Sequence, residues 1–110
     1  MKQAEAEHRR ANPLRGEAAF QIDGTAHVLR PTFGALVAAE EELGPLFALV
    51  ERAGAGELRL SELATLFWHC LADRQALTRE ALGEAIARCG LAACTGPLRT
   101  LLSQILKGSG

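Results

Sequence analysis

Two short runs of alternating apolar and polar residues predict a β-hairpin near the N-terminus. Residues 17–22 and 25–30 flank the pair Asp23-Gly24. An Asp-Gly pair suits a two-residue type I′ turn, because both turn positions need a positive φ. The cross-strand partners expected in this register are Ala18 with Leu29, Phe20 with His27, and Ile22 with Thr25. One face is then largely apolar, and since an isolated hairpin is marginal in water, it must pack on other elements.

After the hairpin, apolar residues recur with the spacing of α-helices and predict five amphipathic helices. Capping residues, prolines and glycines set their expected limits. These limits are Thr32 to Gly44, Pro45 to Ala53, Ser61 to Leu71, Thr78 to Gly90, and Pro97 to Lys107. The expected apolar stripes are Phe33, Leu36, Val37 and Leu43; Leu46, Leu49, Val50 and Ala53; Leu63, Leu66, Phe67, Cys70 and Leu71; Ala81, Leu82, Ala85, Ile86 and Cys89; and Leu98, Leu101, Leu102 and Ile105.

The composition supports a mainly helical chain. There are 18 Leu and 20 Ala against only three Val and three Ile, and Leu and Ala favour helix whereas β-branched residues favour strand. The predicted fold class is therefore α+β, mainly α: an N-terminal β-hairpin packed on about five short amphipathic helices. We expect a flexible N-terminal arm over residues 1–15, a single domain over 16–107, and a loose C-terminal tail over 108–110.

Charge argues against nucleic acid and membranes as partners. The formal net charge is −1, so no global field attracts the chain to DNA, RNA or an anionic membrane. No apolar run approaches the ~20 residues of a membrane span, and residues 1–10 lack the apolar region of a secretory signal. Three cysteines cannot all pair within one chain, which is typical of a reducing compartment. We expect a cytoplasmic location.

The residues that could carry metal or catalytic chemistry are poorly arranged for it. Cys89 and Cys94 are too far apart in sequence for the close ligand pairs of structural zinc sites. Cys70 and Cys89 lie on apolar stripes, where a thiol acts as a small hydrophobic group. His69 precedes Cys70 directly, and neighbouring helical positions point about 100° apart, so it is badly placed to act as a base. We expect no catalytic residue, no metal, no cofactor, and no enzyme.

Glu40 falls on the apolar stripe of its helix, three residues before Leu43. A carboxylate in such a position lies either at the rim of the core or against a cation, and Arg30 is one candidate. Pairing or contact with a partner is favoured over catalysis, because structural carboxylates far outnumber catalytic ones.

Two aromatic residues stand away from the stripes of their helices. Trp68 points roughly 120° from its stripe centre, and Phe47 about as far from its own. One alternative is a second layer of core, since Trp is usually well buried. The other is an exposed anchor for a partner protein, a role that aromatic residues often take at interfaces. Trp68, Phe47 and Glu40 are the candidate partner-binding residues.

Several short motifs suggest a family. They are Asn12-Pro13, Arg15-Gly16-Glu17, Ile22-Asp23-Gly24, Leu29-Arg30-Pro31-Thr32-Phe33, Ala35-Leu36, Glu40 and Leu43-Gly44. Through this hairpin and helix block the chain resembles the small tail proteins of the gene-transfer-agent and phage tail assembly chaperone family, some of which are labelled tail tube proteins. The resemblance continues more loosely to the last helix and covers everything after the N-terminal arm.

The resemblance implies a non-enzymatic tail assembly protein of a phage, prophage or gene transfer agent. Chaperones of this kind coat the apolar, helix-rich tape-measure protein during tail assembly, and leucine-rich helices suit such binding. The alternative is a structural tail component, either a tube or an adaptor subunit, which would be virion-associated. The implied partners are the tape-measure protein or other tail proteins, and a homo-oligomer is a further alternative.

Overall fold

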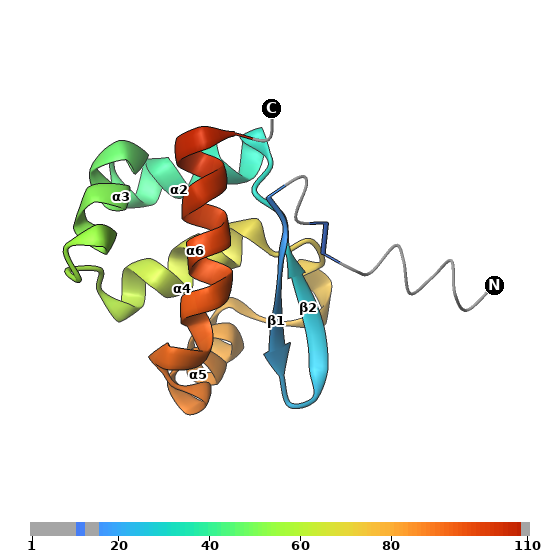
Figure 1. The fold of residues 1–110 in the computed structure, drawn as a ribbon. Coiled ribbons are helices and arrows are strands. Elements are labelled where there is room, and N and C mark those ends of the chain that lie inside the picture. Colours follow the sequence, from blue (N-terminus) through green and yellow to red (C-terminus); the bar gives the residue numbers. More distant parts are fainter. Residues whose placement is uncertain (1–10, 13–15, 109–110) are drawn as a thin grey trace.

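The computed structural model describes residues 11–12 and 16–108. Most of the expected arm (1–15) and part of the expected tail (108–110) lie outside these residues. The elements, in chain order, are β1 (Ala18–Ile22), β2 (Thr25–Leu29), α2 (Phe33–Leu43), α3 (Leu46–Gly54), α4 (Leu60–Cys70), the 3₁₀ turn η2 (Arg74–Ala76), α5 (Arg79–Cys89) and α6 (Leu91–Lys107). The predicted α+β, mainly α fold is confirmed: the hairpin stands beside a group of helices (Figure 1).

The hairpin has the predicted register, with Ala18 opposite Leu29 and Phe20 opposite His27. Asp23 and Gly24 have φ values of 50° and 82°, as a type I′ turn requires. The inward face of β1 is buried, and the Phe20 ring packs edge-on against the Phe67 ring of α4 at a centroid distance of 5.5 Å. Such aromatic pairs add stability beyond the apolar area that they bury.

The outer edge of β2 is joined to the chain segment that follows α4. Leu29 forms an antiparallel bridge with Leu71. The Ala72 N–H donates to the Val28 carbonyl at 2.9 Å, and the Arg30 N–H donates to the Cys70 carbonyl. An open strand edge exposes unpaired backbone groups, so these bonds both cover the edge and attach the hairpin to the central helix.

Helix α4 supplies the centre of the core. Its predicted stripe is confirmed, since all of its members are buried: Leu63, Leu66, Phe67, Cys70 and Leu71. Helices α2 and α5 pack against α4, while α6 packs against α5, β1 and α3. Figure 1 shows α6 crossing in front of the other helices beside β1. Helix α4 begins at Leu60, although Ser61 is the predicted cap. The Glu62 side chain accepts the Arg59 N–H at 2.9 Å at this end of α4.

The predicted start of the last helix at Pro97 is wrong, because α6 begins at Leu91 and contains Pro97 in its interior. Proline normally breaks a helix by removing a hydrogen bond and by crowding the preceding residue. Here the preceding residue is Gly96, which has no Cβ for the ring to meet. Cys94 and Leu101 are both buried on either side of the proline. Their burial holds the two halves of α6 on the same core.

The buried stripe predicted for α2 is wrong in part. Phe33 is 86% exposed and Val37 is also exposed, whereas Ala39 is fully buried. The face turned to the core is therefore rotated toward the alanines by about 70°, taking 100° per residue. The small side chains of Ala35 and Ala39 let α2 lie close to its neighbours, and this contact decides which face is covered.

One of the three thiols, that of Cys89, also departs from the stripe prediction. Cys70 is buried as expected, and burial raises the pKa of its thiol to about 12. Cys89, predicted on the buried stripe of α5, is exposed at the end of that helix, and Cys94 is buried instead. The chain turns at Gly90, and α6 starts at once. The first turns of α6 therefore supply the buried thiol, that of Cys94, in place of the Cys89 thiol.

Gly16 is a position at which a side chain should not be tolerated. Its φ is +72°, and a Cβ there would collide with the Gln104 side chain of α6. We expect Gly16→Ala to lower the free energy of unfolding by more than the about 1–2 kcal/mol that a positive φ alone costs. Gly24→Ala is the matched control, since Gly24 has a φ of +82° but open space around it. Urea denaturation checks the difference, and equal losses in the two variants would contradict the close approach.

Candidate functional site

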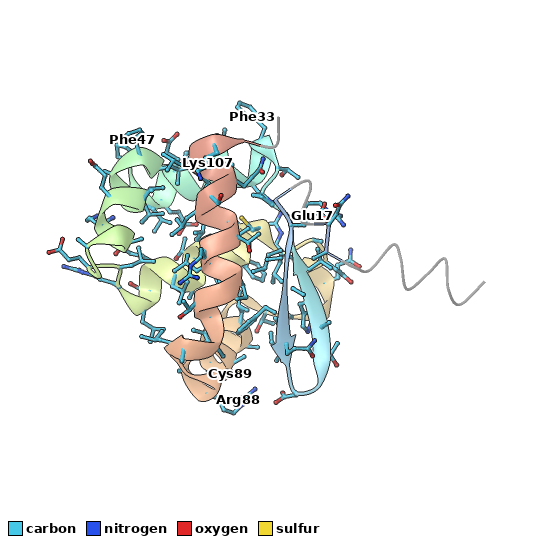
Figure 2. All side chains as sticks on the ribbon, viewed as in Figure 1. Glu17, Phe33, Phe47, Arg88, Cys89 and Lys107 are labelled. Atoms are coloured by element: carbon cyan, nitrogen blue, oxygen red, sulfur yellow. The ribbon has the colours of Figure 1, made fainter. Side chains whose placement is uncertain are left out.

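Several residues of the family motifs meet at one buried carboxylate. The Glu17 side chain is only 3% exposed. Its Oε1 accepts the Asn12 N–H at 2.9 Å, and its Oε2 accepts the Arg30 Nε–H at 2.8 Å. The Glu17 N–H donates to the Asn12 carbonyl at 3.0 Å. The ion pair of Glu17 with Arg30 joins the residue before β1 to the residue after β2. Figure 2 labels Glu17 at the start of the hairpin.

Glu40 has a different partner from the one expected. Arg30 is engaged by Glu17, and the Glu40 Oε2 instead accepts the N–H of Leu46 at 3.0 Å. Leu46 opens α3, and the preceding Pro45 provides no side-chain cap. A carboxylate at a helix N-terminus satisfies an unpaired N–H and complements the helix dipole. Glu40 therefore ties the end of α2 to the start of α3.

The capped helix carries Phe47, whose side chain is 68% exposed in the first turn of α3. Phe33 also points into solvent, and Val37 lies one turn after it on α2. In Figure 2, Phe33, Phe47 and Lys107 lie at the same end of the molecule. Leu106, next to Lys107, is 53% exposed. We call this set, which consists of Phe33, Val37, Phe47 and Leu106, the apolar end.

Sequence reasoning found Phe47 but missed Phe33 and Leu106. Phe33 has helical spacing to Leu36 and Val37, so the pattern assigns it to the core stripe. The signal that favours exposure is the pair of alanines at 35 and 39, which offers a second and smaller face for packing. No comparable signal marks Leu106.

Trp68 takes a position between the two alternatives that the sequence left open. Its ring is partly buried and packs against the edge of the core. The guanidinium of Arg74 lies over the ring, 5.7 Å from its centroid, in a cation–π contact. Trp68 is near the end of α4, whereas Glu40 and Phe47 lie at the junction of α2 and α3. The three candidate residues therefore belong to two places rather than one.

A polar network joins the three helices α2, α4 and α5. Arg79 donates to both carboxylate oxygens of Glu42 and, at 3.0 Å, to the Thr65 hydroxyl. The His69 Nε2 lies 2.7 Å from the Glu42 Oε1. Hydrogen bonds from Arg79 and His69 lower the pKa of Glu42 from 4.5 to about 2. A carboxylate with so low a pKa is a weak general base, so the geometry favours a structural role.

A second ion pair joins Arg52 of α3 to Glu62 of α4, with an Nη2–Oε2 distance of 2.7 Å. Hydrogen bonds from Arg52 and from the Arg59 backbone lower the pKa of Glu62 to about 2 as well.

Over residues 11–12 and 16–108, no group of three His, Cys, Asp or Glu side chains is close enough to hold a metal ion. None of the helices in this part of the chain is long and apolar enough to cross a bilayer.

A family model described as "Phage tail tube protein, GTA-gp10" matches residues 15–108. The chain belongs to this family of phage and gene-transfer-agent tail proteins. No curated protein and no solved structure gives a significant match to it. The matched region includes the hairpin and the helices α2 to α6.

We call the Glu17 carboxylate, with its hydrogen bonds to Asn12 and Arg30, the Glu17 clamp. Its role can be tested by removing the charge of Glu17. We expect Glu17→Gln to lower the free energy of unfolding by about 1–3 kcal/mol, because a buried charge-assisted hydrogen bond to Arg30 is weakened. Glu84→Gln on the exposed surface of α5 is the control and should have no measurable effect. Urea denaturation followed by circular dichroism measures both. A Glu17 variant as stable as the control would contradict the role of the clamp.

The lowered pKa of Glu42 predicts a specific dependence of stability on pH. The folded protein binds this proton less readily than the unfolded chain, so the contribution is fully present above pH 4.5 and is lost as pH falls toward 2. We expect the melting temperature of the wild type to fall more steeply across this window than that of Glu42→Gln. Glu41→Gln, which changes a neighbouring exposed carboxylate, should follow the wild type. Parallel curves for all three proteins would refute the prediction.

Proposed function

We propose that this tail-family protein is a non-enzymatic assembly chaperone that binds apolar helical segments of the tape-measure protein while the tail is built. The observation that carries the proposal is the apolar end, where two phenylalanines stand in solvent on adjacent helices. Large apolar side chains that stand in solvent at one end of a molecule are typical of a surface that another protein covers.

The apolar end is held in place before any partner arrives. Glu40 caps α3 and so orients the helix turn that carries Phe47. The Gly44 N–H donates to the Glu40 carbonyl at 2.9 Å, which ends α2 with a defined geometry. Preorganisation of this kind lowers the entropy cost of binding. It supports a role for Glu40 as a positioning residue for the partner-binding surface, with Phe47 as the residue that makes contact.

A second candidate is a structural role as a tube or adaptor subunit, which the description of the family favours. Ring-forming tube subunits usually rest on a larger β-sandwich, whereas the described part of this chain contains one two-stranded sheet. Purified tail particles separate the two candidates. A structural subunit stays in the particle in stoichiometric amounts, and a chaperone is lost. Retention of the protein in finished tails would therefore overturn the proposal.

The apolar end can be tested by co-expression with the tape-measure protein of the same tail gene cluster. We expect the wild type to keep that protein soluble, and the double variant Phe33→Ala, Phe47→Ala to lose most of this effect. Its melting temperature should stay close to that of the wild type, because both side chains are exposed.

Leu91→Ala is the matched control. Leu91 is 58% exposed and lies two residues after Cys89, which Figure 2 places at the opposite end of the molecule. Its loss should leave the tape-measure protein soluble. Equal effects of the control and the double variant would argue against a defined binding surface, and no effect of the wild type would refute the chaperone function itself.

A further inference from the structure

A groove of about 370 Å³ runs between the first half of α2 and the chain that follows α4. Its lining includes Arg30, Thr32, Gly34, Ala38, His69 and Arg74. Gly34 and Ala38 keep the α2 wall low, and no heavy atom lies within 4 Å of where a Cβ of Gly34 would stand. The volume is at the lower end for ligand pockets. It suits one or two side chains rather than a whole helix.

The lining of this groove carries charge of one sign. Two guanidinium groups and one imidazole line it, and none of its lining residues is acidic. The N-terminal turn of α2 adds the positive end of a helix dipole. Glu40 and Glu41 are exposed nearer the other end of α2 and do not line the groove. The positive charge of the groove is therefore confined to the first half of this helix and the chain beside it.

The two arginines of the groove have different contacts. Arg30 uses its Nε on the buried Glu17 and remains partly exposed to solvent. Arg74 is exposed, and its guanidinium lies over the Trp68 ring in a cation–π contact. A planar guanidinium can bind a carboxylate through two parallel hydrogen bonds.

His69 also lines this groove. Its Nε2 faces Glu42, while its Nδ1 is buried and has no hydrogen-bond partner among the described residues. A buried polar atom without a partner is uncommon in a folded protein and is costly.

We propose that this groove receives an acidic side chain of the tail partner, carried on a segment whose neighbouring apolar residue packs on Phe33. Phe33 lies between Thr32 and Gly34, so the groove and the apolar end meet at the start of α2. The inference rests on the proposed function and names the chemistry of the partner segment. A purely apolar segment does not satisfy the groove, whereas a segment with Asp or Glu beside Leu or Phe does.

Trp68 provides a built-in probe for the experiment. It is the only Trp in a chain without Tyr, and its ring lies under the guanidinium of Arg74. The probe molecule is an amphipathic helical peptide of about 18 residues with Leu on one face and Glu beside it. Its matched control has Gln in place of every Glu. Trp68 emission and the fluorescence anisotropy of labelled peptide are measured with the full-length protein.

We expect the Glu peptide to bind and shift the Trp68 emission, and the Gln peptide to bind about tenfold more weakly or worse. Arg74→Glu and the milder Arg74→Gln should both weaken binding of the Glu peptide. Arg99→Glu, an exposed arginine on α6, should not. Thermal melting verifies that each variant is folded.

Three results would overturn the inference. One is equal binding of the Glu and Gln peptides, and another is an emission shift of the same size with inorganic phosphate alone, which would make the groove a simple anion site. The third is a wild-type dimer in light scattering that Arg74→Glu dissociates, because the occupant would then be the acidic face of a second copy.

Co-expression with the tape-measure protein separates this inference from the proposed function. If the wild type keeps that protein soluble and Arg74→Glu does so equally well, the groove inference is wrong and the chaperone function stands. If the wild type itself has no effect on solubility, the proposed function fails, whatever the peptides do.

Discussion

The buried carboxylate of Glu17 is the contact on which the placement of the hairpin depends. It joins the chain before β1, through the Asn12 N–H, to the residue that ends β2, through the Arg30 Nε. The backbone of Arg30 in turn bonds to Cys70 at the end of α4. A charge so deeply buried is tolerated only when it is paired and hydrogen-bonded. The clamp therefore anchors the small sheet to the helices and sets where α2 begins.

From that starting point, α2 divides the surface into parts with different properties. Its alanine face packs inward, its Phe33 and Val37 face stands in solvent, and the basic groove follows its third side. The carboxylates at its far end have separate tasks. Glu40 caps the next helix, and Glu42 joins α2 to α4 and α5 through Arg79 and His69. One short helix thus both holds the core together and presents the surfaces proposed to bind a tail partner.

This arrangement is consistent with the proposed binding of another polypeptide. The apolar end supplies apolar contact area, and the groove beside it supplies positive charge. The carboxylates with the most perturbed pKa values, Glu42 and Glu62, are each locked in ion pairs between helices. Such pairs shape the surface and its dependence on pH, and their oxygens are already engaged by arginine.

Local patterns in the sequence were sufficient for the hairpin, its turn and the number of helices. The Asp23-Gly24 turn and the α4 stripe depend on neighbouring residues and on strict spacing, so they could be predicted before any tertiary contact was known. Only the tertiary structure decided the rest. The close approach of α2 to α4 selected Ala39 over Phe33 for the core, and burial of Cys94 carried α6 through Pro97. The partner of Glu40 likewise depends on which elements meet in space. The same holds for the groove on which Arg30, Arg74 and His69 converge. Spacing along the chain does not determine which distant elements come into contact.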